Sequence, residues 1–229
     1  MKFTLPLPVK AVMIDLDGTL LDTIPDLAAA ANGMLTELGM PVLSESTIRN
    51  YVGKGIANLI ERTLTNSMDG KPDPALFERA VPVYERTYRE ANGKHTTMYP
   101  GVKEGLDLLR AQGYPLACVT NKSERFTLPL LDYVKLSGYF VSVVAGDTLP
   151  QKKPDPEPLW HACKQMNVEP HEMLMIGDSL NDAQAARAAG CPVFCVTYGY
   201  NEGHDVQSLD VDAIVASLVE ATRLISKKN

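Results

Sequence analysis

Two aspartates, Asp15 and Asp17, follow the apolar residues 12–14 and precede Gly18 and Thr19. An apolar run that ends in this way predicts a buried strand whose C-terminal end opens into a loop. Two charges at the rim of a protein core are costly unless a bound cation or a chemical role offsets them. We therefore treat this stretch as the first candidate for an active site.

Three further polar clusters follow apolar runs later in the chain. They are Thr120-Asn121-Lys122, Lys152-Lys153-Pro154-Asp155-Pro156 and Gly177-Asp178-Ser179-Leu180-Asn181-Asp182. In a parallel sheet the C-terminal ends of the strands share one edge, so all four clusters can converge there. Carboxylate oxygens are the ligands that Mg²⁺ prefers, and a lysine beside a metal suits a phosphoryl group. The residue types thus favour metal-assisted phosphoryl transfer.

The elements that must position these clusters alternate between strand and helix. Short apolar runs predict strands at 9–15, 115–120, 141–145, 173–176 and 193–196. Helical spacing and helix-ending glycines predict helices at 102–112, after Ser123, and at 157–166, 183–189 and 215–227. Alternation of this kind predicts right-handed βαβ units, and hence a Rossmann-like α/β core with helices on both faces of a parallel sheet.

The first connection of this core is unusually long. Residues 22–97 carry three helical patterns, at 26–38, 47–64 and 74–91. An ordinary connection from strand to helix has about 2–6 residues, so this segment is expected to form a separate body. We predict a helical cap domain over 22–97 and a catalytic core over 1–21 and 98–229. The cap leaves from the end of the first strand, where ligands bind in open α/β sheets.

The bulk composition narrows the range of partners. The chain has 229 residues and a formal net charge of −6, which argues against binding to nucleic acid. No stretch approaches the length of about 20 apolar residues needed to cross a bilayer, and the first ten residues make a poor signal peptide. The four cysteines lack CxxC spacing, so we expect buried thiols. These features predict a cytoplasmic protein, a monomer or small homo-oligomer, without a membrane partner.

With its four clusters in this order, the chain closely resembles the haloacid dehalogenase superfamily of phosphotransferases. The first motif of that family is similar to Asp15-x-Asp17-Gly18-Thr19-Leu20, and the second to Thr120. The third is similar to Lys153, directly before Pro154, and the fourth to Gly177-Asp178-x-x-x-Asp182. The likeness covers the whole predicted core, and the helical insert is similar to the small α-helical cap of that family.

The resemblance implies a role for each matching residue of the core. Asp15 is expected to attack phosphorus and form an aspartyl-phosphate, while Asp17 acts as general acid and then as general base. Thr120 and Asn121 are expected to bind the substrate, and Lys153 to offset the charge of nucleophile and phosphate. Because dehalogenases have no need of a general acid at the position of Asp17, a phosphatase or mutase is favoured.

The resemblance also implies a Mg²⁺ cofactor and its ligands. These are the carboxylate of Asp15, the backbone carbonyl of Asp17, and Asp178. Asp182 is expected in or just behind the metal shell, where it would orient Lys153 or a metal-bound water.

Segments outside the catalytic motifs resemble the bacterial phosphoglycolate phosphatases. They include Tyr51-Val52-Gly53-Lys54-Gly55 and Thr197-Tyr198-Gly199-Tyr200-Asn201. This likeness implies a small phosphorylated metabolite, 2-phosphoglycolate, as substrate. Its carboxylate needs a donor from the cap, for which Gly53, Lys54 and Gly55 are candidates through backbone amides or the Lys54 side chain. The alternative for Lys54 is a solvated surface charge.

Other functions stay open at this point. A phosphatase of another small ester or of pyrophosphate uses the same core motifs. A sugar-phosphate mutase is disfavoured because no dedicated acid–base residue stands out in the cap. A non-enzymatic binding protein predicts loss of a catalytic residue, yet Asp15, Asp17, Lys153 and Asp178 are all present.

Overall fold

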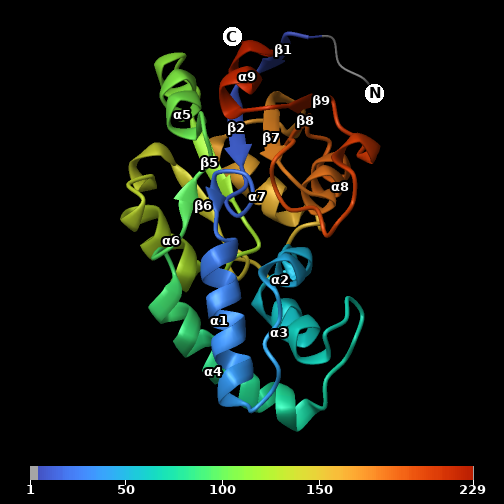
Figure 1. The fold of residues 1–229 in the computed structure, drawn as a ribbon. Helices are drawn as coiled ribbons and strands as arrows, with labels where there is room; N and C mark the ends of the chain where they lie inside the picture. Colours follow the sequence, from blue (N-terminus) through green and yellow to red (C-terminus); the bar gives the residue numbers. More distant parts are fainter. Residues whose placement is uncertain (1–4, 229) are drawn as a thin grey trace.

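Within residues 5–228, the part of the chain that the computed structural model describes, six parallel strands form the central sheet (Figure 1). Their bounds are Ala11–Ile14 (β2), Leu116–Val119 (β5), Ser142–Val144 (β6), Met173–Gly177 (β7), Val193–Val196 (β8) and Ala213–Val215 (β9). The order across the sheet is β6-β5-β2-β7-β8-β9. All neighbouring pairs are parallel, so the C-terminal ends share one edge. The predicted α/β fold is confirmed.

Helices cover both faces of this sheet. Successive residues of β2 alternate between two hydrophobic clusters, with Val12 and Ile14 in one and Ala11 and Met13 in the other. The first cluster packs against helices Val102–Ala111 (α5), Glu124–Tyr133 (α6) and Leu218–Arg223 (α9). The second packs against Glu157–Met166 (α7) and Leu180–Ala189 (α8). Apart from Ser142 of β6, the strands carry no polar side chains, because both faces of the sheet are buried.

The residues that follow β2 form a helical bundle at the C-terminal edge of the central sheet (Figure 1). Its helices are Ile24–Glu37 (α1), Glu45–Tyr51 (α2), Ile56–Thr65 (α3) and Pro74–Ala91 (α4), and they enclose a hydrophobic cluster largely of their own. Strands Leu21–Asp22 (β3) and Thr97–Met98 (β4) pair antiparallel, so the two crossings to the core lie side by side. We propose that residues 22–97 act as a cap and residues 1–21 and 98–229 as the core, of which residues 1–4 and 229 lie outside the described part.

The single helix predicted over 47–64 is wrong. The structure has two helices, α2 and α3, separated by residues 52–55. Gly53 and Gly55 have φ angles of +134° and +84°, which a continuous right-handed helix does not allow. The apolar spacing continues across this break, and this is why the pattern indicated one helix.

The helix predicted over 215–227 is also wrong. Residue 215 ends β9, the helix α9 begins only after Ser217, and a short strand, Ile225–Lys227 (β10), follows. β10 pairs in parallel with Leu7–Val9 (β1) at the other end of the chain. A pairing between segments so far apart leaves no local pattern. The four cysteines are buried and free, which confirms the prediction of buried thiols.

No helix within residues 5–228 combines the length and the apolar character needed to cross a bilayer.

Candidate active site

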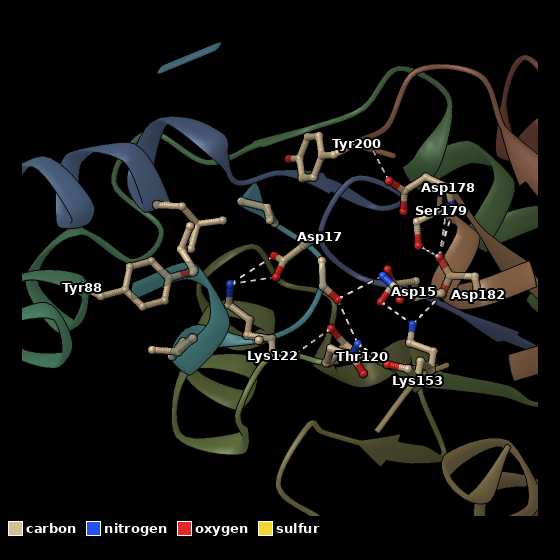
Figure 2. Close-up of a pocket in the computed structure, with 18 residues that line it drawn as sticks. Asp15, Asp17, Tyr88, Thr120, Lys122, Lys153, Asp178, Ser179, Asp182 and Tyr200 are labelled. Carbon is tan, nitrogen blue, oxygen red and sulfur yellow. Dashed lines mark hydrogen bonds and ion pairs between the residues drawn. The ribbon is translucent and has the colours of Figure 1, made fainter. Parts of the chain in front are cut away.

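A pocket between the sheet edge and the helical bundle brings the four polar clusters together (Figure 2). Asp15 and Asp17 reach it from the end of β2, Thr120 from the end of β5, and Asp178 from the end of β7. Lys153 enters from the loop before α7. Asn121, Asp182, Gly53 and Gly55 line the same pocket. Residues far apart in the chain thus meet because parallel strands end at one edge.

Three carboxylates form the acidic end of the pocket. Asp15, Asp178 and Asp182 each offer an oxygen atom within 4.8 Å of the other two, and all three residues are buried. Burial raises the pKa of Asp15 to about 7, and the charges of Asp182 and Asp17 add to this effect while Lys153 opposes it. Burial and the charges of Asp182 and Asp15 likewise raise the pKa of Asp178 well above its usual range.

This cluster fits a divalent cation. Asp15 Oδ1 is buried and accepts no hydrogen bond among the described residues, although the ammonium of Lys153 lies 2.9 Å away as an ion pair. Mg²⁺ binds at sites rich in oxygen atoms, where a carboxylate oxygen without a hydrogen bond is free to coordinate it. The positive charge of the ion would also offset the burial and the mutual repulsion that together raise both pKa values.

The Asp178 carboxylate is held by neighbours on both sides. Its Oδ1 accepts a hydrogen bond from Thr19 Oγ1 at 2.9 Å, and its Oδ2 accepts one from Tyr200 N at 2.6 Å. A Cβ atom on Gly18 or on Gly199 would lie 2.3 Å from this side chain, and Gly18 has a φ of +90°. The glycine of the first motif is therefore needed for both its conformation and its size.

Asp182 lies behind the other carboxylates, with both of its oxygens engaged. Oδ1 accepts from Lys153 Nζ at 2.6 Å, and Oδ2 accepts from Ser179 Oγ at 2.7 Å and Ser179 N at 3.1 Å. The residue is fully buried. This geometry favours the second of the two predicted positions, just behind the metal shell.

Lys153 is buried among oxygen atoms. Its Nζ donates to Asp182 Oδ1 and, at 2.7 Å, to the carbonyl oxygen of Val119, and it pairs with Asp15. Burial by itself lowers the pKa of this lysine, but Asp15 and Asp182 together outweigh burial and raise the pKa above its ordinary value. Lys153 thus keeps its positive charge beside Asp15. Its neighbour Lys152 is exposed.

Asp17 turns its carboxylate away from this cluster and toward Lys122 (Figure 2). The ammonium of Lys122 donates to Asp17 Oδ1 at 3.0 Å and to Oδ2 at 3.1 Å. The side chain of Lys122 is only 2% exposed. The sequence placed Lys122 in the cluster Thr120-Asn121-Lys122, and its burial against Asp17 is what the folded chain adds.

The glycine turn between α2 and α3 reaches the pocket with its backbone. The carbonyl oxygen of Gly53 accepts from Asn121 Nδ2 at 2.9 Å and from Asn181 Nδ2 at 3.4 Å. The ammonium of Lys54 instead lies 3.5 Å from Glu202 Oε2, and its side chain is 43% exposed. The substrate role of Lys54 stays a prediction, and its side chain is not among those that line the pocket.

Two aromatic residues of the pocket carried no prediction of a role. Tyr88 of α4 is buried and places its ring 4.9 Å from the ammonium of Lys122. Tyr200 accepts a hydrogen bond on its hydroxyl from Thr23 N at 2.8 Å, and so ties the loop after β8 to the start of the cap. Neither contact has a signal in local sequence, because each joins segments that meet only in the folded chain.

Comparisons with known proteins agree with this geometry. Residues 12–196 match the family model described as haloacid dehalogenase-like hydrolase. The chain is 63% identical to a phosphoglycolate phosphatase of Nitrosospira multiformis, over 98% of this chain and 99% of that one. It is 56% identical to a phosphoglycolate phosphatase of Thiobacillus denitrificans, over 97% and 98%. The crystal structure of a predicted phosphoglycolate phosphatase from Haemophilus somnus superposes with a TM-score of 0.87 at 33% identity, covering 92% of this chain and 95% of that one.

Proposed function

Because the chain belongs to the haloacid dehalogenase-like hydrolases, we propose that it hydrolyses 2-phosphoglycolate to glycolate and phosphate with Mg²⁺ as cofactor. That it is a phosphatase follows from the family and from the nearly full-length relatives. The observation that carries the substrate proposal is a small pocket in which a buried carboxylate cluster and Lys153 lie together. The cavity measures about 50 Å³.

The chemistry starts at Asp15. Its carboxylate oxygen attacks phosphorus, a bond forms between that oxygen and phosphorus, and the bond to the glycolate oxygen breaks. Asp17 gives a proton to the departing oxygen. In the second half, water attacks the aspartyl-phosphate, its proton passes to Asp17, and phosphate leaves. Asp15 is then restored as a carboxylate.

The other pocket residues hold charge in place during these steps. Asp15, Asp178 and the backbone carbonyl of Asp17 would hold Mg²⁺, whose positive charge would screen the phosphoryl oxygens from the nucleophile. Lys153 neutralises charge beside Asp15, and Asp182 keeps Lys153 in position. Thr120 and Asn121 would bind phosphoryl oxygens.

The size of the pocket favours a small substrate over a nucleotide. A cavity of about 50 Å³ has room for only a few water molecules. A mutase needs an acid–base side chain from the cap. Among the described residues of the cap, Tyr88 is the one side chain lining the pocket that carries an ionisable group. Burial raises the pKa of its phenol well above the usual value, so the group stays protonated near neutral pH and cannot serve there as a general base.

Phosphate release tests this proposal. The enzyme with Mg²⁺ is offered 2-phosphoglycolate, sugar phosphates, nucleotides and pyrophosphate, and kcat/KM is measured for each. We expect the highest value for 2-phosphoglycolate. A value no better than those for the other esters would overturn the substrate assignment. The cytoplasmic location, the oligomeric state and the lack of nucleic-acid or membrane partners stay predictions.

A further inference from the structure

We propose that Lys122 binds the carboxylate of the substrate and thereby selects 2-phosphoglycolate among phosphate esters. The inference rests on the proposed function, because it names the residue that would read the second charged group of that substrate. The sequence suggested that the cap turn Gly53-Lys54-Gly55 binds the substrate carboxylate. We assign that role instead to Lys122, which follows the end of β5 in the core.

The burial of Lys122 is the first observation. Its side chain is 2% exposed, and its residue lines the pocket two positions after Thr120. A buried ammonium is costly unless it is paired. Its partners are the Asp17 carboxylate, at 3.0 and 3.1 Å, and the face of the Tyr88 ring. Lys122 is thus held between the general acid of the core and an aromatic ring of the cap.

The hydrogen bonds of this ammonium leave donor capacity unused. An ammonium has three N–H donors, yet both of the bonds that Lys122 Nζ makes within residues 5–228 go to Asp17. The hydroxyl of Tyr88, whose ring faces this ammonium, is also buried and has no hydrogen-bond partner among the described residues. Unpaired buried donors cost free energy, so the space beside them suits an anionic acceptor.

The charged side chains that line the pocket also support a carboxylate-binding role for Lys122. Lys122 and Lys153 are the cationic side chains among the described residues of its lining. Lys153 is engaged by Asp15 and Asp182 at the nucleophile end. A substrate with two anionic groups therefore meets one lysine for its phosphoryl group and one for its carboxylate. Lys54 is turned toward Glu202 instead.

The chain length of 2-phosphoglycolate matches this division. Asp17 has to lie about 2.6–3.2 Å from the ester oxygen that it protonates. In the substrate, one methylene group separates that oxygen from the carboxylate carbon. The substrate carboxylate must then lie close to Asp17. The ammonium of Lys122, 3.0 Å from Asp17 Oδ1, can therefore contact Asp17 and the substrate carboxylate together. A longer ester would place its charge beyond Lys122.

The test compares 2-phosphoglycolate with its amide, which has nearly the same size without the negative charge. Wild type is expected to prefer the acid strongly. In Lys122→Met, kcat/KM for the acid should fall by about 30-fold or more relative to kcat/KM for the amide, since a buried charge pair is lost. If Lys122 only positioned Asp17, both substrates would lose the same factor, and this result would overturn the inference.

Two controls keep the outcome readable. Lys164→Met removes an exposed lysine on α7 and should leave the acid-to-amide ratio unchanged. Lys122→Gln keeps a neutral hydrogen-bond donor for Asp17, and it serves the same test if Lys122→Met does not fold, as judged by thermal unfolding. Lys122→Gln should also lose the preference for the acid.

A binding measurement separates this inference from the proposed function. Calorimetry on Asp15→Asn is expected to show weaker binding of 2-phosphoglycolate when Lys122→Met is added, and nearly unchanged binding of inorganic phosphate. If wild type does not prefer 2-phosphoglycolate to other esters, the proposed function fails. If wild type prefers it and Lys122→Met retains the preference, the inference about Lys122 alone fails.

Discussion

Asn121 Nδ2 donates a hydrogen bond to the carbonyl oxygen of Gly53 across 2.9 Å, and so joins the core to the cap at the candidate active site. The same Asn121 nitrogen donates to the carbonyl oxygen of Lys153 at 2.8 Å. One side chain thus links the second motif, the third motif and the glycine turn of the cap. The position of the glycine turn and the arrangement of the core residues are therefore coupled through backbone groups.

Replacement of the proposed nucleophile gives the first prediction. Asp15→Asn should lower phosphate release by at least about a thousand-fold, because an amide cannot attack phosphorus as a carboxylate does. The fold should persist, since Asn has the same shape and removes a charge from a crowded acidic cluster. Phosphate release and thermal unfolding are measured on the same sample, and substantial residual turnover would rule out the nucleophile assignment.

The raised pKa of Asp15 predicts how metal-free stability depends on pH. The pKa is 3.8 in the unfolded reference and about 7 in the folded protein, so the folded state binds more protons between these values. The stability that Asp15 contributes to the folded state is fully present below pH 3.8 and is lost as the pH rises through about 7. Added Mg²⁺ should therefore raise Tm more at pH 8 than at pH 5.

Asp15→Asn provides the control for this pH dependence. The difference in Tm between wild type and Asp15→Asn, without Mg²⁺, should change with pH over the same window, in favour of the variant at high pH. A difference that stays constant from pH 4 to pH 8 would contradict the assigned shift.

The close approach of Gly18 to Asp178 predicts a loss of metal-dependent activity in Gly18→Ala. The new Cβ would lie 2.3 Å from Asp178 Oδ2, and the φ of +90° disfavours alanine, so the carboxylate must move. We expect kcat/KM to fall by about 100-fold and the Mg²⁺ concentration for half-maximal activity to rise. Gly138→Ala is the matched control, because no atom lies within 4 Å of its added Cβ.

Asp26 is expected to hold the two crossings between cap and core together. Its fully buried carboxylate accepts hydrogen bonds from Gly93 N and His95 N, each at 2.8 Å, and from the backbone and hydroxyl of Thr96 at 3.1 and 2.6 Å. Asp26→Asn turns one acceptor into a donor that faces these N–H groups. We expect a loss of about 2–4 kcal/mol in the free energy of unfolding by urea.

Asp69→Asn, at an exposed position in the loop before α4, should change that free energy by less than about 0.5 kcal/mol. If Asp26→Asn is no more destabilising than this control, the network around Asp26 does not stabilise the fold as assigned.

Much of the fold was predictable because its signals are local. The strand before Asp15 and Asp17, the helix over 74–91 and the strand over 193–196 follow from short-range apolar patterns. The glycine turn at residues 52–55 and the pairing of β10 with β1 were not predicted. At the glycine turn, the apolar spacing runs on without interruption and gives no sign of the two positive φ angles. For β10, the partner strand β1 lies at the other end of the chain, so no local pattern indicates the pairing.

By itself, the sequence singled out the residues proposed to carry the chemistry. Asp15, Asp17 and Asp178 follow strands whose ends must share one edge, and Lys153 lies in the loop that leads from another such strand to α7. The direction of each side chain was decided only by tertiary packing. Lys54 and Lys122 are both lysines beside a predicted site, yet Lys54 pairs with Glu202 and Lys122 is buried against Asp17. A long flexible side chain takes the direction in which its charge finds a partner, and those partners come from segments that only the fold brings together.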